Sequence, residues 1–402
     1  NESGFYNIVI PSGTFRIRYQ YRGDNEDLRY VPIELEDVVI ANDTTINVVL
    51  EEGYYVSGRV SDLEDDPVVD ADLDAEDSET GEKVFTPGDN TDENGEYLLL
   101  VPAGTYSINV APLPENRLLA AIVYGIPVFE DINLDFILEA GFMLYGTVRD
   151  PVGAGVSDVD LDVEYSSNGG ELFTPDDNTD ESGFYQVILP QYGTFDVLYK
   201  PPVPVDPPYL APLLLEGIYL GGDMERDVIV PSGHLLSGLV QDFREAGVFD
   251  VDIDAVETAS GMDVPLVDDH TDSSGAFATV IIPGVYHLEF EPPRARRLAA
   301  ELLPDYSLNM DTYIEVSLDT GMAVSGAVTD YTGNPMPDVR VIAVESSTQQ
   351  EAFTPGNRTD LSGLYEILVK PDTYDLTYSP DPLSGYPDST LYDRQIETDI
   401  VI

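Results

Sequence analysis

The chain has 402 residues, and its 76 acidic residues against 18 basic ones give a formal net charge of −58. Binding to nucleic acid or to an anionic membrane surface needs basic residues that displace counterions, so this charge excludes both partners. The absence of cysteine excludes a disulfide framework, a thiol nucleophile and Cys-ligated metal sites. No apolar run reaches the roughly 18 residues of a membrane helix, so no membrane insertion is expected within this sequence.

The composition indicates a folded chain despite its charge. Apolar residues make up 43% of the sequence and aromatic residues 10%. They alternate with polar residues in short runs, a pattern that a solvated acidic tail does not need. The sequence therefore predicts a protein with hydrophobic cores.

Two motifs recur along the chain at intervals of about 90 residues. The motif G-x-V-x-D comes near the start of each complete unit, and T-D-x-x-G leads into a later strand. The first copy begins at this second motif, so the front half of the first unit is absent. We expect the chain to be a segment of a longer tandem array. The predicted units, numbered 1 to 5, are residues 1–52, 53–140, 141–232, 233–320 and 321–402.

Short strands are predicted in chain order within each unit. In unit 2 the runs YYVSGRV, ADLDAED, GEYLLLVP and GTYSINVAP alternate apolar and polar residues, with Gly, Pro, Asn and Asp between them. About seven strands in a unit of this size predict an all-β fold, a tandem array of small Ig-like or transthyretin-like two-sheet sandwiches. The RLLAA-type stretches of units 2 and 4 predict one short helix each.

The ends of the units differ in an alternating way. Residues 112–138 match residues 292–318, while the remaining units carry Tyr- and Pro-rich stretches there, which predicts an ABAB order. At the end of the chain, TDIVI (398–402) matches RDVIV (226–230). The last unit is therefore expected to run through to its final strand.

The units resemble carboxypeptidase regulatory-like domains, a transthyretin-like family related to the Cna-B modules of bacterial surface proteins. The matching features are the opening G-x-V-x-D, the T-D-x-x-G-x-[YF] turn, and a strand ending in Pro that G-T-[YF] follows in most copies. The resemblance implies non-catalytic modules of an extracellular or cell-surface protein. The isopeptide bond known among Cna-B-type relatives is not expected, because the three lysines lie at unrelated places.

The strand after the T-D-x-x-G turn is predicted to have two apolar faces. Alternation directs Tyr97, Leu99 and Val101 into the core of unit 2, with corresponding residues in the other units. Two interpretations remain for the apolar residues on the opposite face. They are covered by a neighbouring loop or domain, or they form contacts between units in a fibre. These residues are Leu98, Leu100, Phe184, Ile188, Leu364 and Leu368.

Aspartates at every second position of one strand form the most specific charged pattern. Period-two spacing places them on one face, where they repel one another unless a cation neutralises them. The loop before the T-D-x-x-G turn adds further oxygens, and Ca²⁺ takes six to eight oxygen ligands. The alternative is a solvated acidic surface suited to concentrated salt. The candidate Ca²⁺ ligands are Asp70, Asp72, Asp74, Asp89, Asp92, Asp158, Asp160, Asp162, Asp177, Asp180, Asp250, Asp252, Asp254, Asp269 and Asp272.

No constellation typical of an enzyme is found. The sequence has no G-x-S-x-G, and its three histidines, His234, His270 and His287, look like individual substitutions. We expect a structural protein that forms a stalk, fibre or filament by packing with copies of itself or with neighbouring repeats. The alternative is an adhesin or carbohydrate-binding array in which Tyr199, Tyr209 and Tyr219 contact a surface ligand.

Overall fold

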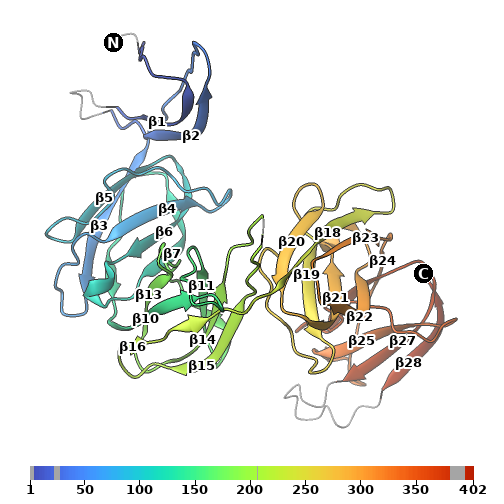
Figure 1. Ribbon diagram of the computed structural model, residues 1–402. Helices are drawn as coiled ribbons and strands as arrows, with labels where there is room; N and C mark the ends of the chain where they lie inside the picture. The colour runs from blue at the N-terminus through green and yellow to red at the C-terminus, as the bar shows by residue number, and fades with distance from the viewer. Residues whose placement is uncertain (1–3, 22–27, 206, 381–393) are drawn as a thin grey trace.

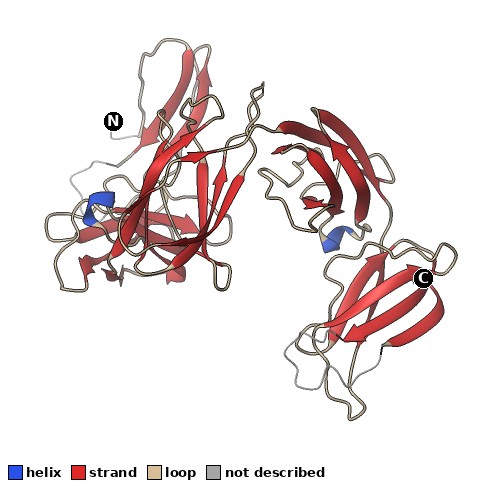
Figure 2. Ribbon diagram, turned by 60° about the horizontal axis from the view of Figure 1, so that its bottom comes forward, coloured by secondary structure: helices blue, strands red, loops and turns tan. Residues whose placement is uncertain are grey.

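The computed structural model describes residues 4–21, 28–205, 207–380 and 394–402. Strands dominate this part of the chain, and Figure 2 shows short helical turns, in blue, between them. These turns are the 3₁₀ segments η1 (Pro114–Asn116) and η2 (Arg294–Arg296). No helix among the described residues is long and apolar enough to cross a membrane. The predicted all-β class, a tandem array of small β-sandwiches, is confirmed.

Unit 2 shows the plan of a complete unit, with two sheets facing each other across a core (Figure 1). The order in the first sheet is β5-β3-β8, with β9 also paired to β3, and the order in the second is β4-β6-β7. Its strands are β3 (Tyr54–Asp62), β4 (Asp72–Asp77), β5 (Glu96–Val101), β6 (Gly104–Ala111), β7 (Ala121–Val128), β8 (Ile132–Asn133) and β9 (Phe136–Leu138).

Units 3 and 4 repeat this plan. Unit 3 contains β10 (Gly141–Arg149), β11 (Asp160–Tyr165), β12 (Gly170–Glu171), β13 (Phe184–Pro190), β14 (Thr194–Lys200), β15 (Leu213–Tyr219), β16 (Met224–Glu225) and β17 (Val228–Ile229). Unit 4 contains β18 (His234–Asp242), β19 (Asp252–Glu257), β20 (Ala276–Ile281), β21 (Gly284–Glu291), β22 (Glu301–Leu308) and β23 (Thr312–Leu318). Their sheets are β13-β10-β16 with β17, β12-β11-β14-β15, β20-β18-β23 and β19-β21-β22.

The two end units contain fewer strands in the described residues. Unit 1 has one antiparallel pair, and unit 5 has a two-stranded sheet, β24-β26, facing a three-stranded one, β25-β27-β28. The strands are β1 (Gly13–Tyr19), β2 (Ile33–Ile40), β24 (Met322–Ala327), β25 (Val339–Glu345), β26 (Leu364–Val369), β27 (Thr373–Pro380) and β28 (Gln395–Val401).

The first and last strands of each complete unit lie side by side and run parallel. We call the first strand the opening strand (β3, β10, β18 and β24) and the last segment the closing strand (residues 132–138, 224–230 and 312–318). In unit 4 the parallel pairing is continuous from Leu236↔Thr312 to Asp242↔Leu318. In units 2 and 3 it is divided into two short stretches.

Four main clusters of buried side chains lie within residues 54–138, 142–230, 236–318 and 324–402. The predicted inward residues Tyr97, Leu99 and Val101 are buried in the first of these clusters. The division of the chain into independently folding domains stays a prediction.

A buried threonine joins the two halves of each of units 2 to 5. In unit 3 the Thr179 hydroxyl donates to the carbonyl oxygen of Val156 (2.7 Å) and accepts from the amide of Val159 (2.9 Å). The threonines of the other T-D-x-x-G motifs make the same pair of bonds. The Thr of this motif therefore satisfies two backbone groups that are otherwise buried without a partner.

The predicted helices at the RLLAA-type stretches are wrong. In unit 2, Leu118 forms an isolated bridge with Ala140, and the chain is extended from Ala121 as β7. The helical turn η1 lies just before this stretch and begins at Pro114, since proline suits the first turn of a helix. Pairing with neighbouring strands overrides the helix propensity of Leu and Ala.

The prediction that unit 5 runs through to its final strand is also wrong. β28 pairs antiparallel with β27, and the register shifts between Tyr374 and Leu376. The same shift occurs where β22 pairs with β21, and Asp399 and Asp305 both have positive φ at this point. β28 is therefore the counterpart of β22, and the described residues of unit 5 contain no closing strand.

Each boundary between units has the same backbone connection. At the boundary of units 2 and 3, Leu119 donates to Glu139 (2.8 Å) and Gly141 donates to Arg117 (2.7 Å). Side chains of Ile188 and Leu119 crowd the α-carbon of Gly141 so closely that a β-carbon there would overlap both. Equivalent bonds lie at the other boundaries, around Gly53, Gly233 and Gly321.

The outward apolar residues fall into two groups. Ile188 and Leu368 line grooves between successive units, in agreement with the interpretation that a neighbouring part of the chain covers them. Leu98, Phe184 and Leu364 remain exposed, with 53%, 37% and 52% of their surfaces accessible.

Candidate functional site

The predicted aspartate row is shorter than the sequence suggested. Asp72 and Asp74 point outward from β4, between Ala71, Leu73 and Ala75, which are fully buried. Asp70 precedes the strand and has a left-handed backbone (φ 60°). Asp158 and Asp250 have the same left-handed backbone in their units (φ 56° and 65°). The alternation of side chains along a strand therefore does not place these first aspartates on the face of the other two. Aspartate tolerates this conformation better than most residues, which explains why it recurs here.

The aspartates of the T-D-x-x-G motif stabilise the turn by accepting hydrogen bonds from its backbone amides. One oxygen of Asp92 accepts from the amides of Asn94 (2.8 Å) and Glu96 (2.9 Å), and these bonds hold its pKa below the usual value. Asp180 and Asp272 make the same bonds, with the same effect on their pKa.

The loop aspartates Asp89, Asp177 and Asp269 lie close to the strand carboxylates. Burial raises the pKa of Asp177 to about 6, and Asp160 and Asp162 add to the increase. Its carboxylate accepts a hydrogen bond from the Thr174 hydroxyl (2.6 Å). Thus the structure brings together the second and third strand aspartates and one loop aspartate in each of units 2 to 4.

Lysines of the chain itself already pair with carboxylates of this face in units 2 and 3. Lys83 lies 3.0 Å from Asp74 in unit 2. Lys200 lies 2.7 Å from both Asp160 and Asp162 in unit 3. In unit 5, Arg358 lies 2.7 Å from Asp338.

Unit 4 instead adds negative charge at this place. Glu291 pairs across the sheet with Asp252, and Glu289 pairs with Asp254. Carboxylate oxygens of Asp254, Glu289 and Glu291 lie within 4.8 Å of one another. Burial raises the pKa of Glu291 to about 7, with further contributions from Asp254 and Glu289, while Arg294 opposes the increase. Three carboxylates with this spacing, and Asp252 paired with Glu291 on the same sheet face, suit a hard cation.

Glu289 and Glu291 are not among the residues predicted from the sequence. The residue opposite the corresponding aspartate is Ala111 in unit 2 and Lys200 in unit 3, so comparison of the repeats gives no signal. Only the strand register shows that Glu291 faces Asp252.

A second group contains a histidine. His270 lies 2.9 Å from Asp269 and 3.9 Å from Asp252, and its hydrogen bond with Asp269 raises its pKa. The other histidines lie elsewhere: His234 is 3.3 Å from Asp311, and the ring of His287 accepts from the amide of Asp305 (3.2 Å). The three histidines share no site.

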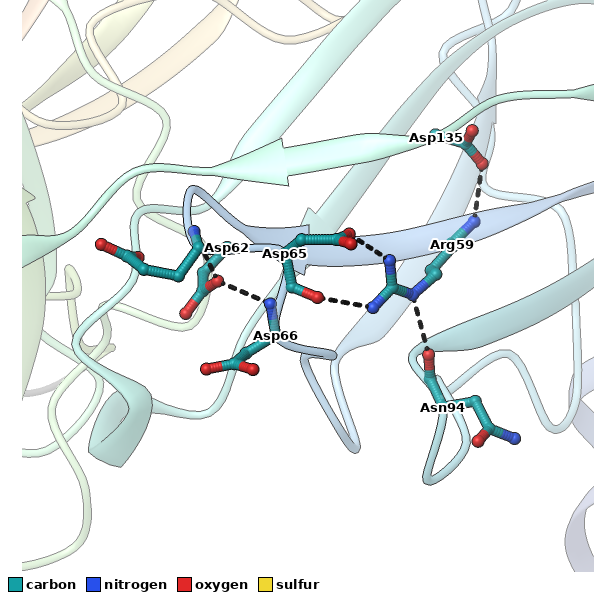
Figure 3. Close-up of polar contacts among 7 residues, drawn as sticks. Arg59, Asp62, Asp65, Asp66, Asn94 and Asp135 are labelled. Atoms are coloured by element: carbon teal, nitrogen blue, oxygen red, sulfur yellow. Dashed lines mark hydrogen bonds and ion pairs between the residues drawn. The ribbon is translucent and has the colours of Figure 1, made fainter.

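Other acidic side chains bind the closing strand to the opening strand. Figure 3 shows Asp135, which lies between β8 and β9 in the closing strand of unit 2, accepting from the amide of Arg59 on β3 (2.9 Å). Arg59 also holds the loops of Asp65 and Asn94. In unit 3, Asp227 accepts from Thr147 in the same way (2.8 Å). In units 2 and 3 the parallel pairing of opening and closing strands is interrupted. There these carboxylates accept hydrogen bonds from opening-strand amides in place of backbone carbonyl oxygens.

The tyrosines predicted to contact a ligand are mostly inaccessible. Tyr199 is fully buried and donates or accepts a 2.9 Å hydrogen bond with Tyr185. Tyr209 packs with Ala211 and Val280 at the boundary of units 3 and 4. Only Tyr219 is exposed, at 56% of its surface. The predicted Tyr-rich contact surface is therefore wrong for two of its three residues.

No family model matches this chain, and no curated protein matches it. Among solved structures it is similar to the Bacillus anthracis TIE protein, with 15% identity over 72% of this chain and 54% of that chain, at a TM-score of 0.20. It is similar to the shaft pilin SpaA from Lactobacillus rhamnosus GG, with 10% identity over 45% and 98% of the two chains, at a TM-score of 0.21. A Streptococcal ancillary pilin is 10% identical over 67% and 99%, at a TM-score of 0.19. This chain thus spans about half the length of the TIE protein chain, and the fold described above rests on its own strand pairing. Membership of the carboxypeptidase regulatory-like family stays a prediction.

Proposed function

We propose that this chain is a load-bearing structural segment of an extracellular stalk or fibre. The observation that supports this most directly is the parallel pairing of opening and closing strands, clearest in unit 4. Tension along the chain enters a unit through its opening strand and leaves through its closing strand. It therefore pulls two adjacent parallel strands in opposite directions, in shear.

Shear differs from unzipping in how hydrogen bonds share the force. An unzipped ladder breaks one bond at a time, whereas a sheared ladder must break many of them together. The acidic residues on the closing strand add to the ladder, since Asp311 accepts from the amide of Leu235 (3.1 Å) at its start. This arrangement suits a protein that transmits force better than one that binds a small ligand.

The boundaries between units support the same function. Arg29 lies 2.6 Å from Asp131 across the first boundary, and Arg117 lies 3.0 Å from Asp223 across the second. Lys370 pairs with Glu301 (2.7 Å) across the last. Together with the recurring backbone connection, these contacts restrict how one unit turns against the next.

Stretching single molecules tests this function. Units 2, 3 and 4 are expected to unfold in separate events, each releasing about 300 Å of chain, because about 90 residues extend by up to ~3.4 Å each. Unit 4 is expected to need the highest force, since its parallel ladder is uninterrupted. Unit 5, with no closing strand in its described residues, serves as the internal comparison and should open at low force. Equal, low forces for all units would contradict a load-bearing role.

We also propose that unit 4 binds Ca²⁺ through Asp252, Asp254, Glu289 and Glu291. Support comes from the cross-strand pairing of like charges and from the raised pKa of Glu291, which shows that ionising this site is unfavourable without a partner. In unit 3 the corresponding position carries Lys200, a built-in cation. The same face is thus neutralised from within the chain in one unit and by a bound ion in the other.

Removal and return of Ca²⁺ test this site. Ca²⁺ added to the chelated protein is expected to raise the free energy of unfolding of unit 4 by about 2.7 kcal/mol at a hundredfold excess over Kd. Glu291→Lys, which copies unit 3, should stabilise unit 4 without Ca²⁺ and abolish its response. Hydrogen exchange measures the stability of each unit separately, and unit 3, which carries Lys200 at this place, is the control that should not respond to Ca²⁺. An equal response to Na⁺ at the same ionic strength would favour the solvated acidic surface instead.

A further inference from the structure

A groove lies at the boundary of units 2 and 3, and a corresponding groove lies at the boundary of units 4 and 5. The first has a volume of about 240 Å³ and the second a volume of about 160 Å³. Their linings correspond, because residues 112–138 match residues 292–318 and unit 3 repeats the plan of unit 5. The differences between the two grooves therefore indicate which ligand each one suits.

In the groove of units 4 and 5 the chain supplies its own guanidinium group. Arg294 of η2 donates to the backbone carbonyl oxygen of Glu366 in unit 5 (3.3 Å). Its guanidinium lies so close to Gly356 that a β-carbon there would be 2.7 Å from Nη2. Glu291 also lines this groove, and Arg294 opposes the increase in its pKa. This groove thus accepts a guanidinium between a carboxylate and a backbone carbonyl oxygen.

A second arginine reaches the corresponding loop at another boundary. The guanidinium of Arg18, on β1 of unit 1, lies over the ring of Phe85 in unit 2, 5.1 Å from the ring centre. Phe85 corresponds to Phe173, since FTPGDN (85–90) matches FTPDDN (173–178), and Phe173 lines the groove of units 2 and 3. Guanidinium groups are attracted to the faces of aromatic rings. Two boundaries therefore place an arginine of one unit against this loop of the next.

The groove of units 2 and 3 has the acidic wall without the arginine. Pro114 stands where unit 4 has Arg294, and no basic side chain lines this groove within the described part of the chain. Asp176 stands where unit 5 has Gly356, so a further carboxylate is added. This groove is therefore both wider and more acidic than the one that holds Arg294.

Carboxylates from two units meet in this groove. Asp72 of unit 2 and Asp176 of unit 3 both line it. Burial raises the pKa of Asp72, and Asp89, Asp74 and Asp176 add to the increase, while Lys83 opposes it. Negative charge thus accumulates across the boundary, and a cation in the groove would relieve the repulsion.

Two basic residues of this region are paired elsewhere. Lys83 lies 3.0 Å from Asp74, and Arg117 lies 3.0 Å from Asp223. Arg117 also donates to the carbonyl oxygen of Pro114 (2.9 Å). A cationic partner for the groove carboxylates is therefore expected to come from another molecule.

We propose that the groove of units 2 and 3 binds the alkylguanidinium group of a separate molecule, as the groove of units 4 and 5 holds that of Arg294. Asp72 and Asp176 accept from its N–H groups, and Phe173 packs against its flat face. Leu118 contacts its alkyl stem. A planar guanidinium donates in several directions at once, which suits two carboxylates from different units better than an ammonium group does.

Titration calorimetry of the 402-residue chain with two probes tests this site. The probes are agmatine, a free alkylguanidine, and acetyl-arginine amide, which represents an arginine of a protein. Saturable binding is expected, and acetyl-citrulline amide, which has nearly the same shape without the charge, should not bind. Tighter binding of agmatine would identify the ligand as a free guanidine, and tighter binding of acetyl-arginine amide would identify it as a protein side chain. Both results support guanidinium recognition.

Pro114→Arg is the most specific variant, because it copies Arg294 and supplies the guanidinium from within the chain. It should abolish binding of both probes and leave the circular dichroism unchanged, since η2 begins with arginine at this position. Asp72→Asn combined with Asp176→Asn should weaken binding about tenfold, through the loss of two exposed ion pairs. Glu181→Gln, at an exposed site of unit 3, removes one negative charge and should bind the probes normally.

Lack of saturable binding by either probe would overturn the inference, and so would equal binding of acetyl-citrulline amide. Binding that persists unchanged in the Pro114→Arg chain or in the double aspartate variant would place the probes elsewhere. Ca²⁺ that protects residues 173–176 from hydrogen exchange, while neither guanidine does so, would make the groove a metal site instead. The force needed to unfold the units is independent of all these results, so the load-bearing function is tested separately.

Discussion

Replacing Gly146 with valine is expected to detach the closing strand of unit 3 and to lower the free energy of unfolding of that unit by about 3 kcal/mol. A β-carbon at Gly146 would overlap the carbonyl group of Arg226, which belongs to the closing strand. Backbone atoms cannot move aside as a flexible side chain can, so the two strands must separate. Hydrogen exchange should show lost protection in residues 224–230 before the rest of the unit.

Gly326→Val is the matched control for this substitution. It introduces the same side chain at the corresponding position of an opening strand, where the three nearest atoms all belong to the side chain of Tyr365. A tyrosine ring can shift, so the expected loss in unit 5 is below about 1 kcal/mol. Equal losses in the two units would show that the close approach of the closing strand is not what requires the glycine.

Thr179→Val is expected to lower the free energy of unfolding of unit 3 by about 3 kcal/mol, since it leaves two buried backbone groups without partners. The hydroxyl bridges the carbonyl oxygen of Val156 and the amide of Val159, and valine has the same shape without the oxygen. Hydrogen exchange of the unit 3 amides, measured at increasing denaturant concentration, gives the loss in free energy of unfolding. Thr194→Val, at an exposed position on β14, should change the stability by less than about 0.5 kcal/mol. A small effect at Thr179 would show that water replaces the hydroxyl.

The sequence predicted the fold class and the inward faces of the strands because period-two alternation reports burial directly. Tyr97, Leu99 and Val101 are buried as expected. The T-D-x-x-G turn is formed where the motif predicts it, with Asp92 accepting from the amide of Asn94. The reason why Thr91 precedes Asp92 is seen only in the structure. Its two partners, Ala71 and Val68, lie 20 and 23 positions away in the sequence.

The failures share a physical cause, which is strand pairing between distant residues. TDIVI and RDVIV are alike in composition, but β28 pairs antiparallel with β27, whereas Val228 pairs parallel with β10. Short similar strings do not specify a partner or a direction. For the same reason, the sequence predicted only two of the four clustered carboxylates of unit 4. Asp252 and Asp254 repeat between units, while Glu289 and Glu291 join them only through register.

We propose that the parallel ladder between opening and closing strands carries the tension, and comparing two pulling directions on unit 4 tests this. Because the chain has no cysteine, Met310→Cys, at an exposed site just before β23, gives a single attachment point. Pulling between the N-terminal side of β18 and residue 310 unzips the ladder from one end, and pulling through the two ends of the unit shears it. The free energy of unfolding is the same in both cases, so a clearly higher opening force is expected in shear. Equal forces in the two directions would contradict it.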